Sequence, residues 1–284
     1  MRNENNYVAD KLKTKVMEHP FSRTELLLGD AAIGVLKNAH IAIFGLGGVG
    51  SYAVEVLARS GVGALDLFDD DCVCASNINR QLYALHSTVG KPKVEVAKQR
   101  VQDINPQCAV NTYRMFYLPE NADDIDLSQY HYVVDCIDTV TAKIELIRRC
   151  HRLQVPIICS MGAANKLDTT AFKVADIYKT DIDPLAKVIR KRLRKEGIPR
   201  LKCVYSEEKP LCPIEGIDTS ATEYTSIAEE NDSSRGKKRI IPASVAFVPA
   251  AAGLIIGGEV VLDLLRKAGV LRPNSQKEYN ERST

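Results

Sequence analysis

Residues 40–50, HIAIFGLGGVG, constrain the fold of this 284-residue chain more than any other stretch. Residues 41–44 are apolar and rich in β-branched and aromatic side chains, as expected for a buried parallel strand. Four glycines follow: Gly45, Gly47, Gly48 and Gly50. The first, second and fourth have the G-x-G-x-x-G spacing, which lets backbone N–H groups approach a phosphate without a Cβ in the way. We expect a helix over about residues 51–60, with its positive N-terminal end facing that phosphate.

An acidic residue completes this nucleotide-binding pattern. The second expected strand, ALDLF, ends at Asp69, nineteen residues after Gly50. A carboxylate at this position can accept hydrogen bonds from both ribose hydroxyls. The glycines alone leave the nucleotide open, because dinucleotide-dependent dehydrogenases use the same device. An NAD-dependent oxidoreductase and a tight turn that binds nothing are therefore alternatives at this point.

The rest of the chain repeats the strand–helix alternation. Strand-like runs lie near residues 40–45, 64–69, 131–137 and 155–160, and helical runs lie at 51–60, 91–103 and 141–152. This rhythm predicts an α/β fold, a Rossmann-like doubly wound sheet that is mostly parallel. We expect an antiparallel continuation at about 170–177 and near 201–206. With 45% hydrophobic residues, the chain can bury one large core.

Charged and polar residues gather just past the second strand. They are Asp69, Asp71, Asn77, Arg80, Gln81 and Lys93. A dehydrogenase has no use for arginine, lysine and further carboxylates next to its ribose ligand, whereas an enzyme that cleaves ATP does. Asp71 or a neighbour could hold magnesium, while Arg80 and Lys93 neutralise charge that develops on the phosphates.

A second carboxylate is expected at the same edge of the sheet. Residues 132–138, YVVDCID, read as a strand that ends near Asp138. Because the carboxyl ends of neighbouring parallel strands open onto one crevice, Asp69 and Asp138 should face the same ligand. Asp138 is therefore a second candidate ligand for Mg²⁺, close to the α-phosphate.

Taken together, these motifs resemble those of the ubiquitin-activating-enzyme-like adenylating family, the ThiF and MoeB kind. The motifs are GLGGVG, D-x-D, SN-x-x-RQ, G-x-PK and D-x-x-D. The resemblance implies an enzyme that makes an acyl-adenylate from ATP and releases pyrophosphate. It also implies roles for single residues: Asp69 as ribose ligand, Asn77, Arg80 and Lys93 as phosphate and transition-state contacts with Gln81 beside them, and Asp138 as the magnesium-linked aspartate.

The N-terminal segment FSRTELLLG, residues 21–29, resembles the family's R-Y-x-R-Q segment. By that resemblance, Arg23 is the arginine that reaches into the ATP site of the partner subunit of a homodimer. Ser22 and Glu25 also have the spacing of a capping box, which predicts that Arg23 lies in the first turn of a helix. The alternative is that Arg23 is an ordinary exposed helix residue.

The cysteines argue against a structural zinc. The chain has eight cysteines but no C-x-x-C pair, whereas many sulfur-carrier members of the family hold zinc through two such pairs. Scattered cysteines, and no secretory signal, suit a reduced cytoplasm. Cys212 lies in segment 206–238, where relatives that form thioesters carry their active cysteine. We interpret it as structural or incidental, because nothing marks it as activated.

Motifs in the second half resemble the tRNA threonylcarbamoyladenosine dehydratase branch, and this resemblance covers about residues 20–268. The motifs are MGAANKLD, DI-Y-KT-DIDPL, AKVIRKRLRKEGI and CVYSEEKP. The implied activity is ATP-dependent cyclisation of threonylcarbamoyladenosine in tRNA. The threonyl carboxylate is adenylated, and the carbamoyl group of the same nucleoside then attacks it and expels AMP. An intramolecular attack needs no nucleophile from the enzyme.

A basic segment gives an independent argument for RNA. Within 185–195, Leu185, Val188, Ile189 and Leu193 fall at helical spacing on one face. The cations there are Lys187, Arg190, Lys191, Arg192, Arg194 and Lys195. Since the whole chain carries only +2, this is a local concentration of charge, which is typical of phosphate-backbone binding. The alternative is a solvated helix face.

We therefore expect one ATP-binding domain over residues 1–271, with a mobile crossover segment at 207–237 and a disordered tail at 272–284. The apolar run 247–265 is interpreted as a buried helix, with Gly253, Gly257 and Gly258 allowing close approach, and no membrane partner is expected. Two rival functions stay open. One is a zinc-free enzyme that activates the C-terminus of a ubiquitin-like or sulfur-carrier protein. The other is an interaction platform that feeds a cysteine desulfurase system.

Overall fold

The computed structural model describes residues 19–214 and 242–271, which build a seven-stranded sheet. The strands are β1 (His40–Phe44), β2 (Ala64–Phe68), β3 (Ala109–Tyr113), β4 (Tyr132–Asp135), β5 (Ile157–Ser160), β6 (Phe172–Asp176) and β7 (Lys202–Ser206). Their order in the sheet is β3-β2-β1-β4-β5-β7-β6. Every neighbouring pair is parallel except β6 and β7, which are antiparallel. The predicted mostly parallel sheet with an antiparallel continuation is confirmed.

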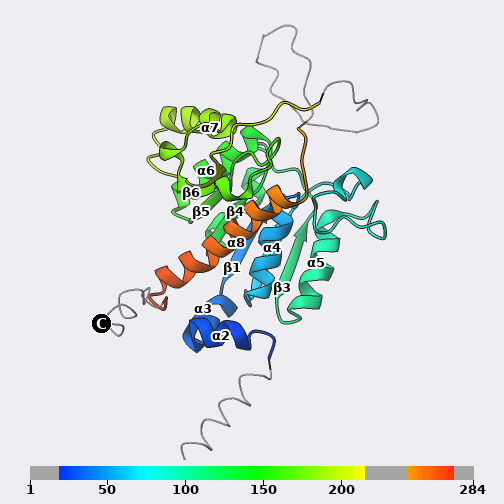
Figure 1. Ribbon diagram of the computed structural model, residues 1–284. Coiled ribbons are helices and arrows are strands. Elements are labelled where there is room, and N and C mark those ends of the chain that lie inside the picture. Colours follow the sequence, from blue (N-terminus) through cyan, green and yellow to red (C-terminus); the bar gives the residue numbers. More distant parts are fainter. Residues whose placement is uncertain (1–18, 215–241, 272–284) are drawn as a thin grey trace, which may run out of the picture.

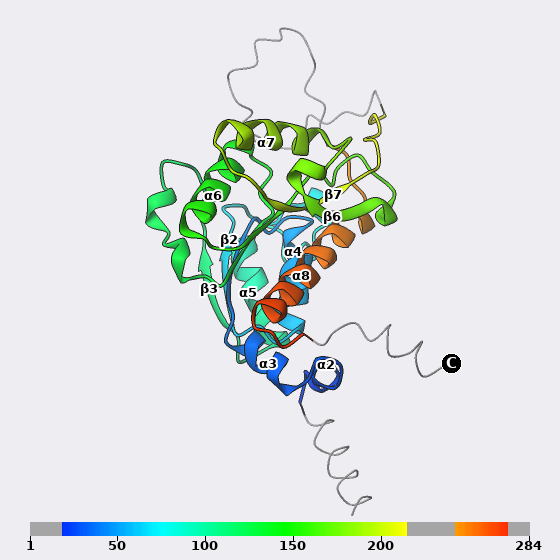
Figure 2. The same cartoon turned by 90° about the vertical axis from the view of Figure 1, so that its left-hand side faces the viewer.

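Helices cover both faces of the sheet (Figures 1 and 2). The α-helices are α2 (Ser22–Leu28), α3 (Asp30–Lys37), α4 (Gly50–Arg59), α5 (Lys93–Ile104), α6 (Val140–Leu153), α7 (Pro184–Lys195) and α8 (Phe247–Lys267). Short 3-10 helices are η1 (Ala75–Asn77), η2 (Ala122–Asp124), η3 (Leu127–Gln129), η4 (Thr169–Ala171) and η5 (Ile177–Lys179). Helices α4, α5 and α8 share one hydrophobic cluster, and α6 and α7 pack on the opposite face.

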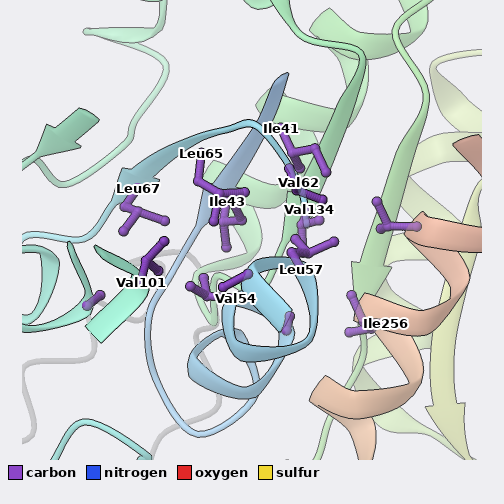
Figure 3. Packing of buried hydrophobic residues seen from close by; sticks show 14 of the residues in the cluster. Ile41, Ile43, Val54, Leu57, Val62, Leu65, Leu67, Val101, Val134 and Ile256 are labelled. Carbon is purple, nitrogen blue, oxygen red and sulfur yellow. The ribbon is translucent and has the colours of Figure 1, made fainter. Parts of the chain in front are cut away.

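The core follows from the alternation of side chains along buried parallel strands. Ile41 and Ile43 of β1 point toward α4, as do Leu65 and Leu67 of β2, and Figure 3 shows them packed against Val54, Leu57, Val101 and Ile256. The intervening Ala42 and Phe44 belong to the cluster under α6. Both faces of β1 are therefore buried, which accounts for its continuous apolar run.

Helix α8 packs against α4 through two of its three glycines. A Cβ at Gly253 would lie 2.3 Å from the carbonyl oxygen of Val49, and one at Gly257 would lie 2.6 Å from the Cβ of Val56. The expectation for Gly258 is wrong, since a Cβ there would meet nothing within 4 Å. By length and composition α8 could cross a membrane, but 56% of its most apolar window is buried inside the protein. The predicted buried helix is confirmed.

Two local expectations differ from the structure. Ser22 does not cap α2: it is the first helical residue, its hydroxyl donates to the carbonyl of His19 at 2.6 Å, and Glu25 pairs with the His19 ring at 2.6 Å. The edge strand β3 was not predicted, because AVNTY carries polar side chains and only Val110 is buried. Most of the expected mobile segment 207–237, and the expected tail 272–284, lie outside the described residues, while residues 207–214 are described.

Candidate active site

The glycine loop between β1 and α4 has a backbone that no larger residue could adopt. Gly45 has φ +89°, and a Cβ at Gly50 would lie 1.8 Å from the carbonyl oxygen of Gly45. The fold therefore needs glycine at these two positions. Within the described part of the chain, the N–H groups of Gly47 and Gly48 have no hydrogen-bond acceptor. These two donors lie before the N-terminus of α4, where an anion is favoured by the helix dipole.

Asp69 follows β2 and faces this loop. Its Oδ2 accepts a hydrogen bond from the N–H of Leu46 at 2.6 Å, and its Oδ1 accepts one from the N–H of Asp71 at 3.0 Å. The ammonium of Lys93 lies 3.5 Å from Oδ1. Burial raises the pKa of the Asp69 carboxyl, and Lys93 and the two N–H groups act against that rise. The carboxylate is thus fixed beside the glycine loop, where an acceptor for ribose hydroxyls is required.

Lys93 is the first residue of α5 and reaches back toward β2. Its Nζ lies 2.6 Å from Oδ2 of Asp71, and the residue is only 4% exposed. Burial lowers the pKa of Lys93, but the nearby carboxylates of Asp69 and Asp71 outweigh burial, so the pKa lies above its ordinary value. Lys93 therefore stays charged at neutral pH and places a fixed positive charge between two carboxylates.

Asn77 is the last residue of η1, and Arg80 and Gln81 lie in the turn that follows it. The guanidinium of Arg80 donates to the carbonyl of Ser76 and to the side chain of Asn79, both at 3.0 Å. Its Cγ would lie 3.5 Å from a Cβ at Gly48, so Arg80 borders the glycine loop. Gln81 is buried, and its amide nitrogen would lie 3.8 Å from a Cβ at Gly47. Asn77 accepts a hydrogen bond from the N–H of Cys74 at 3.1 Å and so also stabilises this turn.

Acidic groups gather on the exposed side of the same crevice. Carboxylate oxygens of Asp69, Asp70 and Asp71 lie within 4.8 Å of one another. Burial, and then the charges of Asp71 and Asp138, raise the pKa of the Asp70 carboxyl. The strand expected to end near Asp138 ends three residues earlier, at Asp135. Asp138 is exposed and is electrostatically coupled to this cluster. These clustered carboxylate oxygens fit Mg²⁺, which prefers carboxylates and water.

The first aspartate of the D-x-x-D motif forms a buried ion pair that was not predicted. Lys143 of α6 lies 3.0 Å from Oδ2 of Asp135, the last residue of β4, and both side chains are fully buried. Lys143 also donates to the carbonyl of Ile137 at 3.0 Å, and Oδ1 of Asp135 accepts from the N–H of Ile137 at 3.1 Å. Both members of the pair therefore bind the backbone of Ile137 and stabilise the turn that carries Asp138.

The cysteine within the D-x-x-D motif is not activated. Cys136 lies between Asp135 and Ile137, and burial raises the pKa of its thiol to about 12. A thiol with such a pKa is protonated at neutral pH and is a poor nucleophile. Cys212 is exposed. Among the described residues, the site therefore combines anion donors, carboxylates and cations around an open loop.

The basic helix α7 presents some but not all of its cations to solvent. Ala186, Ile189 and Leu193 form its buried face, while Val188, expected on that face, is 44% exposed. Arg190 turns inward and donates to the carbonyl and hydroxyl of Thr180 at 2.8 Å and 2.6 Å. Arg194 lies over the ring of Tyr178, 5.5 Å from its centroid. The exposed residues of the expected RNA-binding set are Lys187, Lys191, Arg192, Arg194 and Lys195.

Arg23 lies away from the glycine loop of its own chain. It is exposed on α2, which packs with α3 at the end of the sheet where the strands begin (Figure 1). Hydrogen bonds from Gly63 to Leu36 and from Ala64 to Ala39 fix the end of α3 there. The glycine loop is at the other end of β1, so Arg23 has no place in the site of the same chain.

Comparison with known proteins agrees with this geometry. A model of the ThiF family matches residues 21–282. The tRNA threonylcarbamoyladenosine dehydratase of Bacillus subtilis is 46% identical over 258 residues, which are 90% of this chain and 98% of the relative. The Escherichia coli enzyme of the same description is 36% identical and covers 87% of this chain and 94% of its own length. A crystal structure of the E. coli tRNA N6-threonylcarbamoyladenosine dehydratase in complex with ATP superposes with a TM-score of 0.75 at 33% identity, covering 88% of this chain and 95% of that chain.

Proposed function

Because the chain belongs to the ThiF family, we propose that it dehydrates threonylcarbamoyladenosine in tRNA at the expense of ATP. The observation that carries the proposal is the set of groups around the glycine loop: two open N–H donors, the fixed Asp69 carboxylate, and the charges of Lys93 and Arg80. Such a set holds ribose and phosphates and stabilises the charge of a phosphoryl transition state.

The reaction divides into two steps. The threonyl carboxylate attacks the α-phosphorus of ATP, pyrophosphate leaves, and an acyl-adenylate forms. An atom of the carbamoyl group of the same nucleoside then attacks the acyl carbon, AMP leaves with the oxygen, and a proton is lost as the ring closes. The nucleoside has then lost one water. Both reacting groups already lie on one nucleoside, so the second step needs positioning and no nucleophile from the chain.

The residues divide this work by position. Asp69 orients the ribose, Gly47 and Gly48 donate to phosphate oxygens, and Arg80 and Lys93 stabilise the charge that develops on the pyrophosphate. Asp138, with Asp70 beside it, would hold Mg²⁺, which screens the phosphates when it is bound. Asn77 and Gln81 support the turn that carries Arg80. We place the exposed cations of α7 on the tRNA backbone, where they fix the position of the RNA without reading its sequence.

The assembly belongs to the same proposal. Arg23 cannot reach the glycine loop of its own chain, and we propose that it completes the site of the second subunit of a homodimer. The cytoplasm is the compartment in which such an enzyme would meet tRNA and ATP. The division into one domain over residues 1–271 and a tail at 272–284 stays a prediction, as does a link to a cysteine desulfurase system.

One experiment tests the main proposal. The chain is incubated with ATP, Mg²⁺ and tRNA that carries threonylcarbamoyladenosine. The tRNA is then digested to nucleosides, whose masses are measured by mass spectrometry. We expect the modified nucleoside to lose one water in step with AMP release, and we expect no AMP from tRNA that lacks the modification. Asp69→Ala provides the matched control. An unchanged nucleoside mass with the intact enzyme would refute the proposal.

The rival functions predict other outcomes. An enzyme that activates a ubiquitin-like or sulfur-carrier protein would exchange pyrophosphate into ATP when that small protein is added, and modified tRNA would have no effect. A platform without turnover would keep its effect on a cysteine desulfurase in the Asp138→Ala variant. The dehydratase proposal predicts that Asp138→Ala abolishes tRNA modification.

A further inference from the structure

A short chain of hydrogen bonds links Arg80 to the segment that precedes α8. The guanidinium of Arg80 donates to Oδ1 of Asn79 at 3.0 Å, and Nδ2 of Asn79 donates to the carbonyl of Ser244 at 3.0 Å. Both the oxygen and the nitrogen of the Asn79 amide therefore take part in this link. The guanidinium of Arg80 is therefore held by two acceptors, the carbonyl of Ser76 and the Asn79 amide, and the second depends on where the backbone of residue 244 lies.

Asn165 fixes that backbone. Its N–H donates to the carbonyl of Ala243 at 2.8 Å, and its side-chain Oδ1 accepts from the N–H of Ala243 at 2.8 Å. Its own carbonyl accepts from the N–H of Leu211 at 2.8 Å. One residue thus binds both polar backbone groups of Ala243, the neighbour of Ser244, as a strand partner would.

The backbone of Asn165 is specialised for this contact. Its φ is +60°, in the left-handed region, where asparagine and aspartate are tolerated better than most residues that have a side chain. A residue forced into that region costs free energy, which the surrounding structure must offset. The hydrogen bonds to Ala243 and Leu211 offset this cost.

The loop that carries Asn165 is itself anchored in the core. The next residue, Lys166, is 3% exposed and donates to the carbonyl of Gly162 at 2.6 Å. It also pairs with Oδ2 of Asp183 at 3.1 Å, and Asp183 caps the N-terminus of α7. The loop of Asn165 is therefore held in place by the core, and through Asn165 it restrains the position of Ala243.

We propose that Asn165 is a positioning residue for Arg80, acting through Ala243, Ser244 and Asn79. This role requires no contact of Asn165 with phosphate or substrate. It holds the segment against which the amide of Asn79, and with it the guanidinium of Arg80, is aligned for the pyrophosphate. The proposal rests on the proposed function in one respect, the role of Arg80 in ATP cleavage.

Two substitutions at this position separate the side chain from the backbone. Asn165→Gly accepts φ +60° but removes the Oδ1 acceptor, and Asn165→Asp keeps both the conformation and an acceptor oxygen. Both variants retain the backbone hydrogen bonds to Ala243 and Leu211. We expect Asn165→Gly to lower the single-turnover rate of pyrophosphate formation by on the order of tenfold, as for a small misplacement at a distance from the reacting atoms. Asn165→Asp should restore most of the rate, and the ATP dissociation constant should change much less than the rate.

A double-mutant cycle with Arg80→Ala measures the coupling between Asn165 and Arg80, which a merely structural role of Asn165 would not produce. If Asn165 acts through Arg80, then Asn165→Gly has little further effect once Arg80 is alanine. Asn79→Leu breaks the same chain of hydrogen bonds at another residue. The loss of rate that it causes should likewise not add to the loss caused by Asn165→Gly. Equal losses from Asn165→Gly with and without Arg80 would overturn the proposal, and so would a wild-type rate in Asn165→Gly.

The outcome is distinguishable from failure of the proposed function. If Arg80→Ala alone keeps the wild-type rate, the assignment of Arg80 is wrong whatever Asn165 does. Urea unfolding of each variant shows whether it is folded under the assay conditions. Should Asn165→Gly be unfolded, Asn79→Leu and its cycle with Arg80→Ala decide the question alone: an undiminished loss in the absence of Arg80 overturns the link.

Discussion

The two cations of the site differ in their surroundings, and this difference predicts different consequences of removing them. Among the residues that the structure describes, the acceptors of Arg80 are two neutral oxygens, whereas Lys93 is buried between the carboxylates of Asp69 and Asp71. We expect Arg80→Ala and Lys93→Ala each to lower turnover by on the order of a hundredfold, as for lost transition-state charge stabilisation. Only Lys93→Ala should also lower the free energy of unfolding, because it leaves buried negative charge uncompensated. AMP release and urea unfolding measure the two effects separately, and equal destabilisation by both substitutions would contradict this reasoning.

The coupling of Asp70 to Asp138 can be observed by titration. Burial, Asp71 and Asp138 together hold the pKa of the Asp70 carboxyl above its ordinary value. A raised carboxyl pKa adds stability below the unfolded-state pKa and loses it as the pH rises through the folded-state pKa. Asp138→Asn removes one of the like charges and should lower the pKa of Asp70 in a carboxyl-carbon NMR titration. Asp126, whose pKa is lowered by hydrogen bonds from Ser128, is the internal control and should not move.

Which residues of the site could be foreseen depends on whether a motif or a tertiary contact defines them. Asp69, Arg80 and Lys93 belong to motifs with fixed spacing and lie around the glycine loop as expected. The Asp135–Lys143 pair was missed because a lysine within a helix is ordinarily solvated, and only packing of α6 against β4 buries it. Asn165 was missed for the same reason, since its partners are separated from it by more than forty residues.

At the scale of elements, the contact between α8 and α4 gives a matched pair of substitutions. A Cβ at Gly257 would lie 2.6 Å from the Cβ of Val56, whereas a Cβ at Gly258 would meet nothing within 4 Å. Gly257→Ala should therefore destabilise the protein by about 1–3 kcal/mol through overpacking. Gly258→Ala should be neutral or stabilise it by up to about 1 kcal/mol, the helix-propensity gain. Urea unfolding measures both, and equal effects would mean that α8 does not approach α4 this closely.

The sequence pattern was sufficient for the central strands and for the edge strand β6, but insufficient for the other edge strand, β3. Strands β1, β2, β4 and β5 are buried on both faces or nearly so, and their apolar runs predict them directly. Strand β3 lies at the edge, with burial confined to Val110, so the sequence lacks an apolar run. The register of Ser22 in α2 was misjudged because a serine hydroxyl can donate backward to His19 as readily as it can cap forward.

At the scale of the whole molecule, the proposed RNA surface lies on α7, above the sheet in Figure 1, whereas the C-terminal ends of α3 and α8 lie at the opposite end of the molecule. Replacing Lys191 and Lys195 by glutamine should weaken tRNA binding and reduce the slope of log affinity against log salt by about one to two. The control with the same change of charge replaces Lys37 and Lys267, which are exposed at the other end of the molecule. ATP affinity should be retained in both variants. Equal losses of tRNA affinity would show that net charge, and not α7, governs binding.

The position of α2 makes the proposed homodimer testable without a structure of the assembly. If Arg23 completes the site of the other subunit, each site combines Arg23 from one chain with Lys93 from its partner. Equal mixing of Arg23→Ala and Lys93→Ala subunits, by co-expression, then forms mixed dimers in which one of two sites is complete. Random pairing gives mixed dimers in half of the population, so activity should recover to about one quarter of the wild-type value.

The control for this complementation mixes Arg80→Ala with Lys93→Ala. Arg80 and Lys93 lie at the same site of the same chain, so no arrangement of these subunits yields a complete site, and activity should stay at the level of the single variants. If Arg23 acted within its own chain, its mixture with Lys93→Ala would also fail to recover. Recovery in the first mixture alone would therefore require that Arg23 crosses a subunit boundary. The proposal leads us to expect this recovery, since α2 and the glycine loop lie at opposite ends of β1.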